Sequence, residues 1–347
     1  MLSTELDASN TDIPPETLSC SGWRPSERVC RLADDHNRSI PGVGAERAIH
    51  YTEFYKKAAK KSQSKQVLNA QALAYHLQHR TIEIHDQEWI VGSHTEHRIG
   101  AICHIEKAGS AMLEDLFRFE KRDVNPLYMA PGVRWRLLRS VIPYWLNRSI
   151  GMRAFPLLQR IKFATEQLSG TWFTVNEAGG IGHFLPDYES IIQLGTEGLR
   201  ARVFARQTAG TKGKSEAHFL EAALIALDAT EQFADRYRAE AQRLGRQDLV
   251  ELLRRCPRKP AQTLREALQT IWFFQMIVQM ESIDQGISLG RMDQYLYPLY
   301  LKEKAYTDFD TDTTRDLLAA FCLKLYEVIH LFSSRATHFF SGLPSGQ

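Results

Sequence analysis

The amino-acid sequence predicts an α/β protein that is mostly helical, and three observations carry this prediction. Apolar residues recur at intervals of three and four through most of the chain, which is the spacing of amphipathic helices. Alternation of apolar and polar residues is concentrated within residues 81–105, where it indicates strands. The 347 residues are 44% hydrophobic and 24% charged, so the chain can bury one large core or two smaller ones.

The first 45 residues differ in composition from the rest of the chain. They are rich in Ser, Pro, Asp and Gly, which predicts a loose N-terminal extension over residues 1–45. Helical spacing begins at Glu46, and a second helix is expected over about residues 66–79. We therefore expect one domain over residues 46–347.

Short strands are predicted next, in segments rich in residues that favour extended backbone. The segments are residues 81–85, 89–92 and 99–105. Helical spacing then returns and continues through most of the remaining sequence. The further helices are expected at about 110–121, 131–147, 153–168, 187–200, 215–245 and 247–255.

The clearest helix of the chain begins at a capping box formed by residues 263–266. Its residues 264–280 are apolar on nearly every side, which predicts burial in the body of a large fold. Polar residues follow from Glu281, and buried polar groups must be hydrogen-bonded or functional because leaving one unpaired costs about 1–3 kcal/mol. A last helix is expected to be capped by Thr311 or Asp312.

Charge and composition argue against several functional classes. With 43 Lys and Arg against 41 Asp and Glu, the net charge of +2 gives no electrostatic reason to expect a nucleic-acid or membrane partner. The sequence begins without the features of a signal peptide, and its longest uncharged apolar run, residues 267–280, is shorter than the ~20 residues that span a bilayer. Five scattered cysteines fit reduced thiols, so we expect a cytoplasmic protein.

Two apparent ligand motifs are weak. Residues 213–215 resemble the end of a phosphate-binding loop, but Thr208 stands where that loop requires a glycine. Four histidines between residues 85 and 104 lack the spacing and the partner residues of a metal site. We therefore expect these histidines to be surface or packing residues, and we expect no bound metal.

A glycine-rich turn before His183 is a candidate binding feature. Three glycines within residues 179–182 let the backbone turn sharply and approach a ligand closely. His183 follows them, and Asp187 lies four residues further on, at the expected start of a helix. The alternative is that His183 is an ordinary loop histidine and that Asp187 is a helix N-cap.

A second candidate follows the buried helix, where Glu281, Ser282, Asp284, Arg291 and Asp293 cluster in the sequence. One interpretation is an internal ion-pair network, in which Arg291 holds a carboxylate such as that of Asp293 through two parallel hydrogen bonds. The other interpretation is a polar pocket floor that contacts a substrate. The two are compatible if Glu281 and Ser282 face the ligand and the other three residues are structural.

These two blocks carry a resemblance to a known family. The sequence GRMDQYLYP at residues 290–298, with EALQ at 266–269 and ES at 281–282, resembles the pyruvate formate-lyase-like glycyl radical enzymes. The pair GH at residues 182–183 occurs in the same order as in that family. The resemblance runs from about Glu46 to the end of the chain.

The resemblance implies a fold and a chemistry. The family builds a ten-stranded α/β barrel from two half-barrels wrapped by helices, and the barrel encloses a dry active site. A glycine near the C-terminus carries a radical that is installed by a separate activating enzyme, which uses S-adenosylmethionine and an iron–sulfur cluster. A loop cysteine then becomes a thiyl radical and takes hydrogen from a small-molecule substrate, which leads to C–C, C–O, C–N or C–S cleavage by a lyase. We expect the complete protein to be a homodimer.

The chain departs from the family pattern towards its C-terminal end. The family's radical cysteine and radical glycine belong to later segments, and no cysteine here stands in the expected loop; Cys322, for instance, falls within a predicted helix. We therefore expect a truncated first part of the barrel that has neither radical residue, binds no cofactor and is inactive alone. A half-barrel would leave strand edges and apolar surface uncovered, which favours association.

By position in the family, the substrate-pocket candidates are His183, Asp187, Glu281 and Ser282. In members that eliminate water or a related leaving group, a histidine at this position assists its departure by donating a proton. Because the sequence around residues 100–107 departs from the pattern common among dehydratases, arylacetate decarboxylases and fumarate-adding synthases are alternatives. The alternative from another class is a noncatalytic helical scaffold or remnant.

Overall fold

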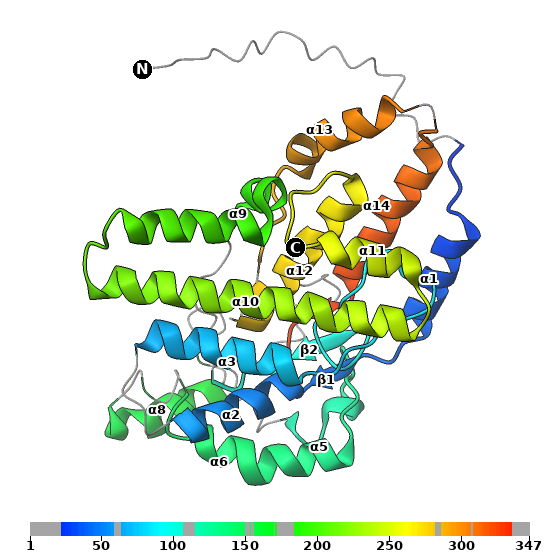
Figure 1. Cartoon of the computed structure of the whole chain (residues 1–347). Helices are drawn as coiled ribbons and strands as arrows, with labels where there is room; N and C mark the ends of the chain where they lie inside the picture. The colour runs from blue at the N-terminus through cyan, green and yellow to red at the C-terminus, as the bar shows by residue number, and fades with distance from the viewer. Residues whose placement is uncertain are drawn as a thin grey trace.

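The computed structural model describes residues 22–58, 64–106, 115–149, 153, 156–169, 171, 184–281, 286–306 and 308–334, and the structural statements below concern these residues. Helices dominate them, and three short strands lie among the helices (Figure 1). The long helices are α1 (Glu27–Arg38), α2 (Glu46–Ala58), α3 (Lys65–His79), α8 (Leu157–Leu168), α9 (Tyr188–Thr208), α10 (Lys214–Arg243), α11 (Gln247–Arg255), α12 (Leu264–Glu281), α13 (Met292–Lys304) and α14 (Thr311–Tyr326). The strands are β1 (Gly42–Gly44), β2 (Gly100–Ile102) and β3 (Val328–Ile329). The shorter helices are the 3-10 helix η2 (Phe119–Lys121) and three consecutive segments: α5 (Pro131–Arg136), the π-helix η3 (Leu137–Val141) and α6 (Ile142–Trp145).

The three strands form one parallel sheet in the order β1-β2-β3. Gly42 lies opposite Gly100, and Ala101 lies opposite Ile329. Because all three strands run in the same direction, the residues that follow them lie at one edge of the sheet, the carboxyl edge. The residues that precede the strands lie at the opposite, amino edge, and these two edges carry different polar groups.

Glycines in β1 and β2 allow the loop before β2 to pack directly on the sheet. A Cβ atom placed on Gly44 would come within 2.3 Å of Thr95 Cγ2, and one on Gly100 would come within 2.0 Å of Thr95 Oγ1. A larger side chain at either position would therefore displace Thr95 from the sheet.

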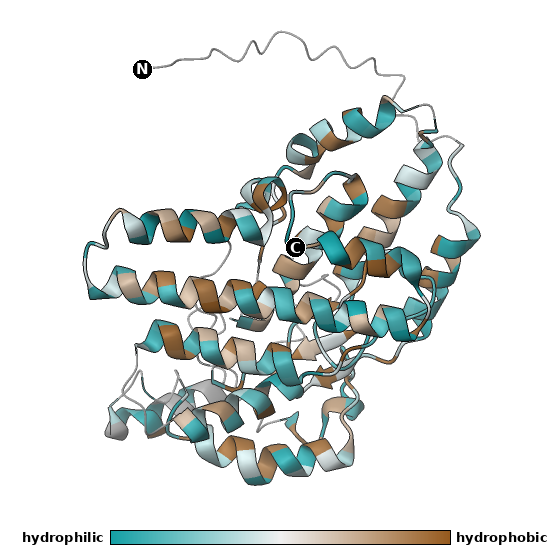
Figure 2. Cartoon of the chain, in the orientation of Figure 1, coloured by the Kyte–Doolittle hydropathy of each residue, from teal (hydrophilic) through white to brown (hydrophobic). Residues whose placement is uncertain are grey.

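Helix α12 runs through the largest hydrophobic core, as its apolar sequence predicts. Trp272 and Met276 are fully buried there and belong to a core that includes residues of α3, α10 and α11. The predicted N-terminal cap is confirmed, because Thr263 Oγ1 accepts a hydrogen bond from the Glu266 N–H at 3.1 Å. The surrounding helices carry both hydrophobic and hydrophilic residues, as amphipathic helices do (Figure 2).

The predicted strands at residues 81–85 and 89–92 are wrong. These residues form an irregular loop whose backbone is bound by side chains of helix α12. Gln269 bonds both the N–H and the C=O of Val91 at 2.9 Å, and Trp272 Nε1 donates to the carbonyl of Gly92 at 3.0 Å. The strand-like composition of this segment therefore reflects packing against a helix rather than pairing in a sheet.

The loose extension predicted for residues 1–45 also needs correction. Helix α1 and strand β1 lie within it, and Val29, Leu32 and Val43 are buried. Ser26 caps α1 by accepting from the N–H of Val29. Residues 1–21 lie outside the described residues, so the prediction for this part of the extension stays untested.

Most of the predicted helices are confirmed, with differences at a few positions. Of the helix predicted at 110–121, residues 110–114 lie outside the described residues, Asp115 is helical, and a turn separates it from η2. Asp310, rather than Thr311 or Asp312, caps α14. Helix α13 was not predicted, and it contains Pro298, which usually argues against a helix interior.

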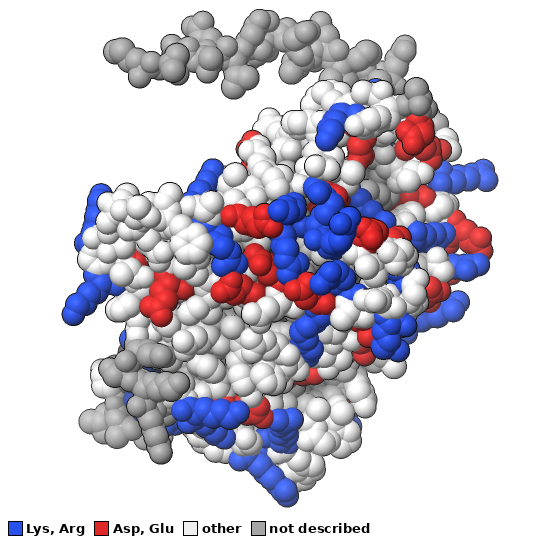
Figure 3. Space-filling model, viewed as in Figure 1, with Lys and Arg blue, Asp and Glu red and all other residues white. Residues whose placement is uncertain are grey.

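The face of the molecule in Figure 3 mixes Lys and Arg with Asp and Glu and shows no large patch of one sign. Among the described residues, no helix is long and apolar enough to cross a membrane.

Candidate active site at the carboxyl edge of the sheet

The carboxyl edge of the sheet gathers polar side chains from the residues that follow each strand. Arg47 follows β1, His104 and Glu106 follow β2, and His330 follows β3. Ligands of open parallel sheets bind in the crevice beyond this edge, where the loops after the strands can be varied without disturbing the sheet. The edge is therefore the first place to look for a site.

Helix α12 ends at the same edge, and its last carbonyl groups are bound by side chains from the sheet. His104 Nε2 donates to the carbonyl of Gln279 at 2.8 Å. Arg47 donates to the carbonyl of Met280 through Nε and to that of Glu281 through Nη2, the latter at 2.9 Å. The last carbonyls of a helix have no partner within it, and a cation there is favourable. These contacts fix the position of Glu281 relative to the sheet.

Arg47 also forms a two-bond ion pair with Glu106. The Nη1–Oε2 and Nη2–Oε1 distances are 2.9 and 2.7 Å, and the two side chains are 2% and 19% exposed. Burial alone would raise the pKa of Glu106, but the attraction of the Arg47 guanidinium outweighs it and lowers this pKa to about 2. Both groups therefore stay charged at neutral pH, and the pair joins β1 to β2.

A small cavity opens beside the end of α12. Its volume is about 20 Å³, and it is lined by Ile102, His104, Gln279 and residues 328–331. His94 is buried nearby, and burial followed by repulsion from Arg80 lowers its pKa to about 3. The His94 imidazole is consequently neutral at physiological pH, so it is no source of protons there.

Two of the four pocket candidates, His183 and Ser282, lie outside the described residues, as does Asp284. The segments next to them are described, and they pair with each other. The Phe184 N–H donates to the carbonyl of Gly286 at 3.2 Å, and the Ser288 N–H donates to the carbonyl of Phe184 at 3.0 Å. The residue after His183 thus lies beside the segment that follows residues 282–285. Whether His183 and Ser282 share one pocket stays a prediction.

Asp187 and Glu281 are both exposed. Asp187 is the N-cap of α9, and its Oδ1 accepts from the N–H of Ser190 at 3.0 Å. That hydrogen bond lowers the pKa of Asp187 and satisfies part of its carboxylate. Glu281 is the last residue of α12.

Arg291 and Asp293 form the anticipated ion pair, with two hydrogen bonds of 2.9 and 2.7 Å. Their side chains are 68% and 65% exposed, so the pair is not part of an internal network in the described structure. It lies at the start of helix α13, where Arg291 is the N-cap residue.

Sequence reasoning missed Arg47, His104 and Glu106. Arg47 lies in the first turn of a helix among apolar residues, where a charged residue usually faces water. The available signal was the requirement for partners at the end of a buried helix, which favours a cation at that point. That requirement does not say which of the 43 basic residues meets it.

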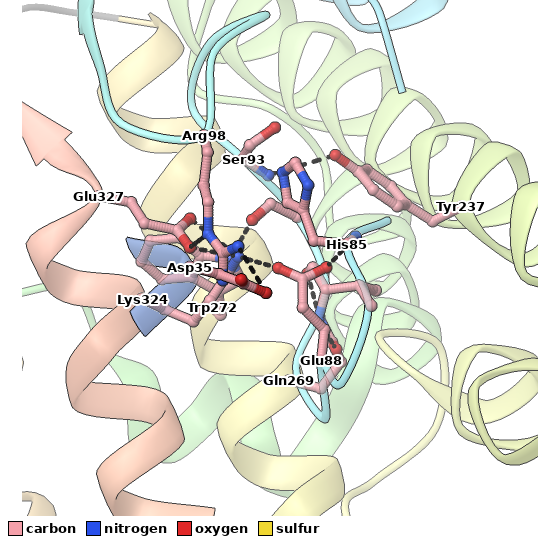
Figure 4. Close-up of polar contacts among 12 residues, drawn as sticks. Asp35, His85, Glu88, Ser93, Arg98, Tyr237, Gln269, Trp272, Lys324 and Glu327 are labelled. Carbon is pink, nitrogen blue, oxygen red and sulfur yellow. Dashed lines mark hydrogen bonds and ion pairs between the residues drawn. The ribbon is translucent and has the colours of Figure 1, made fainter. Parts of the chain in front are cut away.

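The amino edge of the sheet carries a different polar cluster, shown in Figure 4. Lys324, on α14, binds Glu88 at 2.7 Å and Glu327 at 2.8 Å, and all three side chains are nearly fully buried. Arg98 lies 3.8 Å from Glu327 and 3.9 Å from Asp35. Burial raises the pKa of Glu327 to about 7, against the opposing effect of Lys324. Two basic groups therefore face three acidic groups here.

Fold and site together define a helical α/β protein with its candidate site at the carboxyl edge of a parallel sheet. The sequence matches the family Pyruvate formate lyase-like over residues 23–347, and the chain belongs to this family. It is similar to the Probable dehydratase YbiW of Escherichia coli K12, with 28% identity over 330 residues that cover 88% of this chain and 39% of YbiW.

Two further comparisons agree with this assignment. The chain is 24% identical to the isethionate sulfite-lyase of Nitratidesulfovibrio vulgaris over 332 residues, which cover 89% of this chain and 40% of that enzyme. Its structure superposes on that of a Roseburia inulinivorans protein described for 1,2-propanediol dehydration, with a TM-score of 0.83 and 26% identity over 92% of this chain and 42% of that one. The chain spans about two fifths of the length of these relatives.

Proposed function

We propose that this chain is the substrate-facing N-terminal part of a glycyl radical lyase that removes a leaving group from a small, polar, hydroxyl-bearing molecule. Support comes from the relatives, which are described as dehydratases and a sulfite-lyase. The observation that carries the proposal is the joining of helix α12 to the carboxyl edge of the sheet through Arg47 and His104. This contact places Glu281, and the chain that continues from it, at the edge where ligands of such sheets bind.

In this proposal His183 donates a proton to the departing group, because loss of hydroxide or sulfite is easier when the leaving group is protonated as it leaves. Ser282 and Glu281 hydrogen-bond the substrate from the end of α12. Asp187 holds the start of α9, four residues after His183, through its bond to Ser190. The pairing of Phe184 with residues 286–288 supports the approach of these two segments.

The radical chemistry belongs, in this proposal, to a part of the protein beyond the present sequence. That part would supply the loop cysteine and the glycine, and a separate iron–sulfur enzyme that uses S-adenosylmethionine would install the radical. The chain alone would bind no cofactor and would be inactive. The complete protein would act in the cytoplasm as a homodimer in which the three described strands belong to the first half-barrel.

The experiment begins with the coding DNA downstream of residue 347. The expected result is a continuing frame that encodes a cysteine loop and a C-terminal glycine motif. Its product, activated under anaerobic conditions, should show the electron paramagnetic resonance doublet of a glycyl radical. It should also convert 1,2-propanediol or isethionate, the compounds named for two of the relatives. Unrelated downstream sequence would contradict the proposal and favour a noncatalytic remnant.

Substrate turnover separates the branches of the family. The enzyme would belong to one of the alternative branches if it decarboxylated an arylacetate, or added a hydrocarbon to fumarate, and had no activity on the hydroxylated compounds. That result would contradict the proposed elimination reaction. In an eliminating enzyme, His183→Gln should lower kcat at least ~100-fold, the usual contribution of a general acid. The exposed Gln193→Ala variant, two turns into α9, serves as the matched control and should be unaffected.

A further inference from the structure

The cavity between the end of α12 and strand β3 is the strongest unassigned feature of the described residues. Its volume is about 20 Å³, and about 10–15 Å³ of such space is enough to hold one water molecule. Its walls combine apolar strand residues with His104, His330 and Gln279. The cavity is therefore large enough for one water-sized molecule and offers polar groups to bind it.

Gln279 provides the second observation. Gln279 is 4% exposed, and neither Oε1 nor Nε2 makes a well-aligned hydrogen bond among the described residues, although the carboxamide interacts with the neighbouring His94 imidazole. Leaving a buried amide unpaired costs about 1–3 kcal/mol. The other buried glutamines of α12 have direct partners, because Gln269 binds Val91 and the Gln275 amide donates to the Ile287 carbonyl at 3.1 Å. Gln279 differs from both in lining the cavity.

The surroundings favour a neutral ligand. No Asp, Glu, Lys or Arg is among the described residues that line the cavity. His94, a buried neighbour of Gln279, is kept neutral by burial and by Arg80. Burying an ion without a partner of opposite charge is far more costly than burying a neutral molecule that can hydrogen-bond.

We propose that this cavity binds one neutral, hydroxyl-sized molecule that both donates and accepts hydrogen bonds, with Gln279 as its main partner. In the protein without substrate, this molecule is a water. The hydroxyl group of a small alcohol has the same chemistry and can take the same place. The inference concerns only this binding site and does not depend on the proposed reaction.

The site has a structural consequence for the end of α12. Arg47 ties this helix end to the segment after β1, and His104 ties it to the segment after β2. A molecule bound between Gln279 and the residues after β3 ties the helix end to the third strand as well. All three strands then hold the point from which Glu281 and the following residues extend.

Crystallography of the 347-residue chain tests the proposal in three arms. Crystals grown without alcohols should show a density peak about 2.7–3.2 Å from Oε1 or Nε2 of Gln279. Crystals soaked in 1,2-propanediol should show either the same isolated peak, which identifies water, or density continuous with the diol, which identifies an alcohol hydroxyl. Crystals under xenon pressure should show no xenon, because xenon enters dry apolar cavities. An empty cavity, bound xenon, or a Gln279 amide bonded to protein in place of a ligand would overturn the proposal.

Two variants on the same helix provide the matched comparison. Gln279→Leu should abolish the peak, whereas Gln269→Leu, which removes a buried glutamine already bonded to protein, should leave it in place. A peak of unchanged height and position in Gln279→Leu would show that Gln279 is not the main partner and would overturn the proposal. If that variant does not fold, the three arms on the unmodified chain still decide the outcome.

Discussion

The two edges of the sheet both contain buried charges, but they use them differently. At the amino edge, Lys324 is enclosed by Glu88 and Glu327, and Arg98 lies close to Glu327 and Asp35. At the carboxyl edge, Arg47 divides its donors between Glu106 and the last carbonyls of α12. The carboxyl edge also has a cavity, which Gln279 lines.

This difference separates a structural cluster from a candidate site. The charges of the amino-edge cluster lie within 3.9 Å of opposite charges, so its role is to hold α14 and the loop around Glu88 against the sheet, although Arg98 Nε and Glu327 Oε2 make no hydrogen bond. The carboxyl edge differs in the cavity that Gln279 lines, which leaves room for a ligand beside polar groups. The contrast teaches that burial and charge alone do not mark a functional site; the space beside the polar groups has to be considered as well.

The largest expected effect comes from breaking the carboxyl edge. Arg47→Met removes the partner of the buried Glu106 and two donors from the end of α12, so we expect a loss of about 4–5 kcal/mol in the free energy of unfolding. Urea denaturation followed by circular dichroism measures it. The exposed Arg291→Met, which breaks a surface pair, is the control and should leave the unfolding midpoint unchanged. A loss below about 1 kcal/mol for Arg47→Met would contradict the assigned role of this residue.

Breaking the amino edge should have a somewhat smaller effect. Lys324→Met leaves Glu88 and Glu327 buried without their common partner, and we expect a loss of about 3–4 kcal/mol. Part of the penalty is relieved because a buried carboxyl group can take up a proton instead. In the proposed complete enzyme, the folded Lys324→Met protein should have the kcat of the unmodified enzyme. The folded Arg47→Met protein should have a lower kcat. Equal loss of kcat in both would remove the distinction between the edges.

The two edges should also respond to pH with opposite sign. The lowered pKa of Glu106 gives stability that is present above the unfolded value near 4.5 and is lost as the pH falls towards 2. The raised pKa of Glu327 gives stability that is present below pH 4.5 and is lost as the pH rises to about 7. Glu327→Gln should therefore flatten the stability profile between pH 4.5 and 7, and Glu106→Gln should flatten it only below 4.5. Unfolding midpoints measured across pH 3–8 test both expectations. A stability profile that is steeper in Glu327→Gln than in the unmodified chain would contradict them.

The smallest expected effect concerns the cap of α9. Asp187→Ala should cost about 1 kcal/mol, and Asp187→Ser, which keeps a capping oxygen, should recover most of that loss. Thermal unfolding compares the two variants. If Asp187 also contacts the substrate in the complete enzyme, Asp187→Ser should restore stability without restoring activity. Full recovery of activity in Asp187→Ser would show that Asp187 only caps α9 and does not contact the substrate.

The sequence allowed most helices to be predicted, because apolar spacing and caps such as Thr263 and Glu266 are local features. The strands at residues 81–92 were predicted wrongly because their hydrogen-bond partners are side chains from α12, far away in the sequence. The GRMDQYLYP block identified the family but not its own helix, α13, since Pro298 interrupts the expected pattern.

The candidate site was only partly predictable for a related reason. His183 and Ser282 were selected by resemblance to a family, which carries positional information that one sequence lacks. The roles of Arg47, His104 and Gln279 depend on contacts between segments 175 to 234 residues apart, and no local pattern encodes those contacts.

The central claim is that His183, next to Phe184, and Ser282, next to the end of α12, meet in one enclosed pocket at the carboxyl edge. A crystal structure of the complete enzyme with a bound diol tests it most directly. The account predicts that the His183 imidazole and the Ser282 hydroxyl both contact the ligand, inside a closed pocket of about 300–1,000 Å³. A ligand held elsewhere, with the two side chains apart and facing solvent, would contradict it.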